Sequence, residues 1–331
     1  MRPSLRLVLR LIVALLGGAG IASCTGDRDP ELMYRNYLER LGNVTGIAVP
    51  ADVAIEPIPP YPRTREIVLP ELEIRVGVLT YLALGECRLL QAISERNSSL
   101  GRVQAASERL VYERSFLHRI RACEGEVQQS RPDDRAFLDQ LAAIRLDKEA
   151  NLPRVFWNAT FAGPEFRTLL STGTPALQRG ESLALAEAEA ALDHLTHLGR
   201  TLFEGPGPDG SLAGQLYPLQ VQKSVGKLLH GLQVSQYYLA QASALLEQTA
   251  AANRLCPMGR KTPRGGYLFN VFVKFYAGEV QPYVSGLHRQ GAGVLGKLHA
   301  LRQATPVEPP GAFATFYDRW LNPESPGGLW L

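Results

Sequence analysis

One segment near the end of the chain combines glycines and a lysine in a spacing that can hold phosphate. Residues 291–298 read Gly-Ala-Gly-Val-Leu-Gly-Lys-Leu, which matches GxGxxG and begins the GxxxxGK[ST] pattern. The first pattern needs a preceding strand, but residues 284–290 read as helix; in the second, Leu298 replaces the hydroxyl that would bind Mg²⁺. We therefore predict no nucleotide and no other cofactor, and expect the glycines to let helices approach closely.

Histidine and cysteine side chains offer the other candidate chemistry. His194 and His197 stand three residues apart, but no HExxH or ExxH motif supplies further ligands, so we predict no metal site. Cys256 as a nucleophile would need a base that the sequence does not place, and no GxSxG motif is present. No catalytic residue is assigned, and the sequence leans against an enzyme.

Cys24 follows a segment organised like a secretory signal. Three arginines precede the apolar stretch 11–19, and the small-residue segment 20–23 leads to the cysteine. The apolar stretch is shorter than the roughly 18–20 residues of a membrane span. Residues 21–24 resemble the bacterial lipobox, whose cysteine receives a diacylglycerol, and ordinary cleavage near Ala22 is the alternative.

This signal predicts the domain boundaries and the location of the protein. We expect a signal peptide at 1–23, a tether at 24–30 and a single helical domain at 31–331. Thr25, directly after the cysteine, resembles the outer-membrane class of lipoproteins. The sequence therefore predicts a protein of the bacterial cell envelope, held at the outer membrane by acyl chains on Cys24 and facing the periplasm.

The charge balance argues against a nucleic-acid partner. The whole chain has 35 Lys and Arg against 32 Asp and Glu, and residues 1–23 hold three Arg and no acid. Removing these three leaves 32 basic and 32 acidic residues in 24–331, a net charge of zero. A neutral body has no electrostatic preference for a phosphate backbone.

Three cysteines remain beyond Cys24, namely Cys87, Cys123 and Cys256, and an exported compartment allows one disulfide among them. If residues 86–97 and 104–124 form a helical hairpin, Cys123 would lie roughly 15 Å beyond the position opposite Cys87, outside bridging range. The pairing therefore stays unassigned at this point.

The hydrophobic pattern predicts a mainly α fold. Apolar residues recur at three- and four-residue steps through most of the chain after residue 86. Residues 72–78 alternate apolar and polar, which is typical of a strand, and the proline-rich segment 49–62 reads as a strap across the body or as a ligand for a proline-binding groove. We expect an elongated helical bundle with a small strand element near residues 66–79.

Aromatic and basic residues between 260 and 276 form the candidate interaction surface. The aromatic stripe from Tyr267 to Tyr276 has helical spacing, which is more typical of a core, although tyrosines can also anchor an interface. The basic residues are more typical of a solvated loop, and the alternative is a contact for lipid headgroups or an anionic wall polymer. The candidate surface comprises Tyr267, Tyr276, Arg260, Lys261 and Arg264.

Four short motifs give the chain a family resemblance. They are Ile58–Pro62, Glu95–Gly101, Trp157–Gly163 and Val280–Tyr283. With the lipobox and Cys256-Pro257, they resemble the bacterial lipoproteins grouped as a domain of unknown function, number 3080. The likeness runs from about residue 34 to residue 320. It implies a single domain on an export signal and brings no established activity.

These observations favour a non-catalytic lipoprotein that acts as an adaptor by binding another envelope component. One alternative is a hydrolase or transferase acting on cell-wall or lipid substrates, which would show a cleft with two or more perturbed carboxylates. The other alternative is a carrier of an apolar ligand between helices. Its signature would be a closed apolar cavity lined by the stripe at 267–276.

Overall fold

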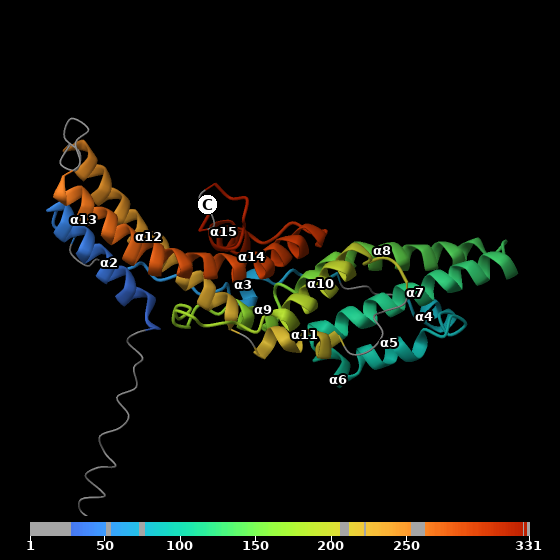
Figure 1. The fold of residues 1–331 in the computed structure, drawn as a ribbon. Helices are drawn as coiled ribbons and strands as arrows, with labels where there is room; N and C mark the ends of the chain where they lie inside the picture. The colour runs from blue at the N-terminus through green and yellow to red at the C-terminus, as the bar shows by residue number, and fades with distance from the viewer. Residues whose placement is uncertain are drawn as a thin grey trace, which may run out of the picture. The chain divides into compact units, whose positions relative to one another are not determined.

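The computed structural model describes residues 28–331 apart from 51–53, 73–76, 206–211, 222, 253–261, 327 and 330–331. The described residues form helices and connecting loops (Figure 1). They divide into two compact units. Unit 1 is built from the described residues of Met1–Ala51, Gln178–Glu181 and Tyr238–Tyr283, and unit 2 from those of Asp52–Leu177, Ser182–Tyr237 and Val284–Leu331. The expectation of one domain over 31–331 stays a prediction.

Unit 1 begins with α2 (Pro30–Thr45). Asp29 caps this helix by accepting a hydrogen bond from the Glu31 backbone N–H at 2.9 Å, and Pro30 supplies a first residue that needs no hydrogen-bond partner. Gly46 ends the helix in the left-handed conformation, at φ 67°. The apolar face of this helix is buried and includes Tyr34, Tyr37, Leu38 and Leu41.

Three further segments pack with α2 in unit 1. They are the last part of α12 (Ser224–Ala251), α13 (Pro263–Val271) and the π-helix η3 (Phe272–Val280), which leads into α14 (Gln281–Ala304). α13 lies beside α2 (Figure 1). The Tyr34 ring stacks on Tyr238, with ring centroids 5.4 Å apart, and meets the Tyr283 ring edge-on. Contacts between tyrosine rings, one stacked and one edge-on, therefore join α2 to α12 and α14.

Unit 2 contains the remaining helices and the rest of α12 and α14. Its longest pair, α7 and α8, runs side by side (Figure 1). The other helices of this unit are shorter than these two. The unit comprises α3 (Thr64–Ile67), α4 (Val78–Ala83), α5 (Leu90–Asn97), α6 (Ser99–Arg102), α7 (Ala106–Ser130), α8 (Arg135–Ala159), α9 (Pro164–Leu169), α10 (Ala186–Arg200), α11 (Leu212–Val221) and α15 (Gly311–Trp320).

An aromatic cluster forms the core of unit 2. Trp157 is fully buried at the end of α8, with its ring 5.1 Å from Phe161 and 4.8 Å from Phe313 of α15. The proline-rich segment is a strap over this cluster, because the Tyr61 hydroxyl donates to the Phe161 carbonyl at 2.8 Å and the Tyr61 ring packs against Phe316. The strap interpretation is thus confirmed for the described part of residues 49–62.

The predicted strand element near residues 66–79 is wrong. Ile67 lies in helix α3 and α4 begins at Val78, while 73–76 lie outside the described residues. The described part of the backbone between these helices, residues 68–72 and 77, does not pair with a strand. Asparagine side chains of α8 take the place of a neighbouring strand and bond to the backbone of Leu69 and Leu72. The described residues therefore contain no strand here, and most of the alternating segment lies outside them.

A disulfide joins Cys87 to Cys123, whose Cα atoms are 5.3 Å apart. The expectation that these residues lie beyond bridging range is wrong, because residues 86–97 do not form one helix. Cys87 lies in a turn, and Arg88 has a φ of 56°, which reverses the chain before α5 begins at Leu90. Cys256 lies outside the described residues.

Candidate functional site

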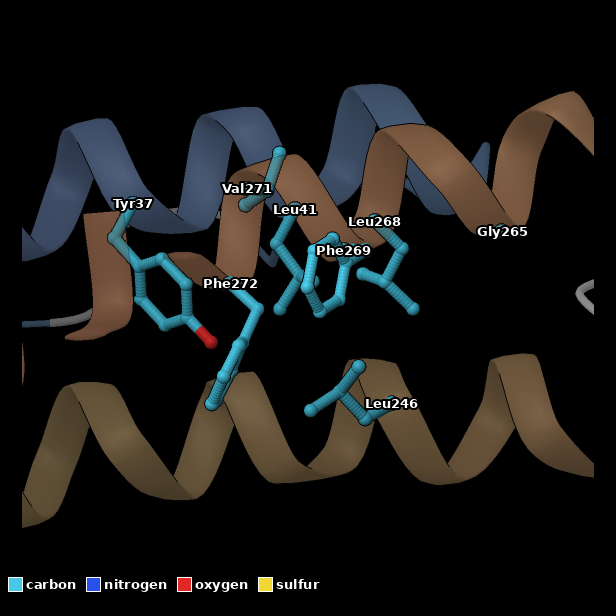
Figure 2. A pocket seen from close by; sticks show the side chains of 8 residues that line it. All are labelled: Tyr37, Leu41, Leu246, Gly265, Leu268, Phe269, Val271 and Phe272. Carbon is cyan, nitrogen blue, oxygen red and sulfur yellow. The ribbon is translucent and has the colours of Figure 1, made fainter. Parts of the chain in front are cut away.

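An apolar groove of about 310 Å³ opens in unit 1 between α2, α12 and α13–η3. Figure 2 shows side chains of α2 and α13–η3 facing Leu246 of α12 across it. Its lining is almost wholly hydrocarbon, with the Tyr37 hydroxyl as the main polar group. The lining residues are Tyr37, Leu41, Leu246, Gly265, Leu268, Phe269, Val271 and Phe272.

The aromatic stripe forms one wall of this groove. The stripe follows α-helical spacing, but from Phe272 onward the chain is a π-helix, whose i→i+5 hydrogen bonds place more residues in each turn. The stripe therefore does not stay on one buried face. Val271 is buried, whereas Phe269 and Phe272 remain 64% and 49% exposed. These aromatic side chains leave exposed apolar surface at the groove wall.

The predicted interaction surface is brought together only in part. Tyr276 stacks on Phe272 at 5.5 Å and lies 5.9 Å from Tyr37, so it extends the groove wall. Burial, followed by the proximity of Tyr276, raises the pKa of the Tyr37 hydroxyl, which stays protonated and able to donate. Tyr267 is 62% exposed and does not line the groove.

The basic part of the predicted surface divides between two regions. Arg264 lies beside Gly46, where its charge favours the C-terminal end of α2. Arg260 and Lys261 lie outside the described residues. Arg264 is thus the one of the three predicted cations whose position is described. Its charge stabilises the C-terminal end of α2.

Two other cations, which the sequence analysis did not single out, lie close to one aromatic ring of η3 in unit 1. The Arg40 guanidinium and the Lys274 ammonium each lie 5.5 Å from the centroid of the Phe275 ring. Arg40 neighbours Leu41 of the lining, and no ion pair joins either cation to an acidic side chain within the described part of the chain. The two cations are far apart in sequence, so no local motif could have indicated them.

A polar pocket of about 280 Å³ in unit 2 lies beside an ion network. Arg109 pairs with Glu71 at 3.1 Å and with Glu113 at 2.7 Å, and Lys148 pairs with Glu113 at 2.7 Å. Asn158 donates to Glu71 at 3.3 Å. Each carboxylate is engaged by a cation, so the pocket holds a neutral network rather than a free general acid or base.

The histidine pair does not assemble a metal site. His194 has a buried Nε2 without a hydrogen-bond partner in the structure, and burial, then His197 and Arg114, lower the pKa of its ring. No cluster of three or more metal-ligating side chains occurs among the described residues. His194 is therefore a neutral ring packed in unit 2.

The glycine-rich segment lies inside α14, not in a loop. A Cβ on Gly293 would come within 2.6 Å of the Glu189 carboxylate on α10, and Lys297 pairs with Asp193 on the same helix. This contact involves the flexible end of a side chain, and Gly296 has nothing within 4 Å, so close helix packing at these glycines is not confirmed. Lys297 takes part in an ion pair.

Comparison with known proteins gives one match. A family model described as "Protein of unknown function (DUF3080)" matches residues 34–327. The chain belongs to the DUF3080 family. No curated protein and no solved structure matches it. Within the described residues of this DUF3080 protein, no helix is both long and apolar enough to cross a membrane.

Proposed function

We propose that this DUF3080 protein is a lipid-anchored, non-catalytic protein of the bacterial cell envelope that binds a hydrocarbon chain of a lipid in the groove of unit 1. The observation that carries the proposal is the groove lining, which is apolar on all sides and includes aromatic rings left half-exposed. Ligand sites of this size have largely apolar walls with few polar groups.

The location rests on the residues that precede α2. Cys24 in its lipobox-like context receives the anchor, and Thr25 directs the protein to the outer membrane, facing the periplasm. The disulfide between Cys87 and Cys123 supports export, because such bonds persist in oxidising compartments. An adaptor role remains the second candidate, and the feature that favours it is Tyr267, whose exposed ring lies outside the groove.

Replacing Cys24 tests the anchor. We expect Cys24→Ala to abolish acylation and to leave the protein unprocessed or soluble, since no other lipid attachment is proposed. Incorporation of labelled palmitate and fractionation of membranes measure this, with Cys256→Ala as the matched control that should still be acylated. Normal labelling and retention of Cys24→Ala would reject the lipoprotein proposal.

Replacing a groove residue tests the binding site. Phenylnaphthylamine, an uncharged apolar dye, should bind the mature protein with enhanced fluorescence. Phe272→Asp places a carboxylate in the apolar lining, and we expect it to weaken dye binding at least about tenfold. The matched control is Phe203→Asp, because Phe203 is also an exposed phenylalanine, in unit 2. Equal dye binding by both variants, or none by the wild type, would refute the groove as a binding site.

A further inference from the structure

Two motifs of the family resemblance meet at the polar pocket of unit 2, which the proposed function does not use. Arg96 of the motif Glu95–Gly101 lines this pocket, and so do Asn158 and Gly163 of the motif Trp157–Gly163. The two motifs lie far apart in the sequence, and the fold places both at one cavity of about 280 Å³. A shared pocket therefore accounts for two motifs that the groove of unit 1 leaves unexplained.

The first motif holds the Arg96 side chain against its own loop. The Ser98 hydroxyl accepts from the Gly101 backbone N–H at 3.0 Å and donates to the Glu95 carbonyl at 2.7 Å. A Cβ on Gly101 would overlap with the carbonyl oxygens of Glu95 and Arg96, so this close turn requires glycine. The Arg96 Nη1 atom donates to the Gly101 carbonyl. The motif thus positions a guanidinium at the pocket.

The charge of Arg96 has no acidic partner. Arg96 forms no ion pair within the described part of the chain, and its Nε atom is buried without a hydrogen-bond partner there. The other charged residues of the lining, Arg109 and Glu71, pair with each other at 3.1 Å, and Glu113 behind them is also bound by Lys148. The described lining thus holds two arginines and one glutamate, a net charge of +1.

Two further charges lie next to lining residues and offset each other. Arg167 donates to the Thr64 hydroxyl, and the Glu165 carboxylate lies beside Gly163. The positive charge of Arg96 therefore remains when these two are counted. A buried N–H without a partner costs free energy, and an acceptor that bonds to it recovers that cost.

The unbonded edge of Arg96 matches a carboxylate. With Nη1 bonded to Gly101, the guanidinium keeps the Nε–H and Nη2–H groups, which lie side by side and point the same way. Such a fork bonds both oxygens of one carboxylate group. Val68 and Pro164 add apolar surface to the lining, where the hydrocarbon part of a ligand can pack.

We infer that this pocket binds a small aliphatic carboxylate, whose oxygens accept from Nε and Nη2 of Arg96 and whose hydrocarbon part contacts Val68 and Pro164. Because neighbouring atoms cover Nε, binding includes a small shift of the Arg96 side chain that turns this edge to the pocket. The site lies wholly within unit 2 and does not depend on the lipid groove of unit 1.

Butyrate is the probe for this site, and butyramide, which has the same shape without the charge, is its matched control. Both are titrated into the mature chain carrying isotopically labelled arginine, and the Nε–H signals are followed by NMR. The signal that is missing from Arg96→Gln identifies Arg96. We expect butyrate to shift this signal to saturation and to bind at least about tenfold more tightly than butyramide, because hydrogen bonds between charged groups are the stronger ones.

Variants test whether the pocket and its cation carry the binding, which is followed through the NMR signals of butyrate itself. Arg96→Gln should weaken butyrate binding at least about tenfold. Arg102→Gln removes the same charge from an exposed position of the same segment outside the lining, and should bind as the wild type does. Val68→Phe fills the pocket without changing a charge and should also abolish binding, so the test does not depend on Arg96→Gln alone.

Three results would overturn the carboxylate inference. They are the absence of a saturable shift of the Arg96 signal with butyrate, equal binding of butyrate and butyramide, and equal weakening by Arg96→Gln and Arg102→Gln. The last result would show a general effect of charge and not a site. Dye binding in the groove of unit 1 is measured separately, so the failure of one proposal leaves the other standing.

Discussion

Replacing Glu113 with alanine is expected to lower the free energy of unfolding by about 3–5 kcal/mol, the usual cost of breaking a buried ion pair. Glu113 is 1% exposed and is the acid bound by Lys148, which is itself buried against the rings of Tyr112 and Phe116. Without Glu113, the Lys148 ammonium loses its direct partner, whereas Arg109 keeps Glu71. Urea unfolding followed by circular dichroism measures the loss.

A second replacement tests whether the unpaired charge on Lys148 causes the loss of stability in Glu113→Ala. Adding Lys148→Met to Glu113→Ala removes the unpaired charge and restores apolar contact with the two rings, so the double variant should recover most of the lost stability. Leu146→Met, at an exposed position on the same helix, is the matched control. No recovery in the double variant would show that the loss comes from packing and not from the charge on Lys148.

The pH dependence of Glu113→Ala gives an independent readout. Burial lowers the pKa of Lys148 below its ordinary value of 10.5, and Glu113 opposes that shift, so removing Glu113 lowers this pKa further. Between the lowered pKa and 10.5, the unfolded chain binds more protons than the folded chain, and stability rises with pH. The destabilisation should therefore be smaller near about pH 10 than near about pH 7.

Trp157→Ala is expected to cost about 3–5 kcal/mol, the range found when a large buried aromatic side chain is removed. The indole is fully buried between Phe161 and Phe313, and its Nε1 donates to the Ile67 carbonyl at 2.7 Å. The variant loses both the packing and the link between α8 and α3. Denaturant unfolding of this variant measures the sum of these two terms.

Trp157→Phe separates the contribution of the aromatic packing from that of the hydrogen bond to the Ile67 carbonyl. Phenylalanine keeps most of the ring contact and removes the donor, so the expected loss is about 1–3 kcal/mol, the cost of an unpaired buried polar group. If Trp157→Phe and Trp157→Ala were equally destabilised, the hydrogen bond to Ile67 would dominate over the aromatic packing.

The sequence predicted the helices well because their information is local. The strap containing Tyr61, for example, depends on the prolines of a single segment. The mainly helical class and the family followed from the same kind of signal.

Features that depend on distant residues were not predictable in this way. The disulfide depends on a single residue, Arg88, whose left-handed backbone separates Cys87 from α5. The groove depends on η3, and an apolar pattern does not distinguish a π-helix from an α-helix. The cations at Phe275 come from positions 40 and 274, which only the fold brings together.

The asparagine contacts of α8 have a consequence for how this family can vary. Asn158 bonds to both backbone groups of Leu69, and Asn151 accepts from the backbone N–H of Leu72. Seven helical residues rise about 10.5 Å, and three extended residues span about 10 Å, so the two repeats match in length. The asparagines of α8 thus bond to the main chain of residues 69 and 72 and not to their side chains. Residues 69 and 72 can therefore exchange for other residues that keep a backbone N–H, which excludes proline. A one-residue insertion between 69 and 72, or between 151 and 158, would break the match between the two lengths.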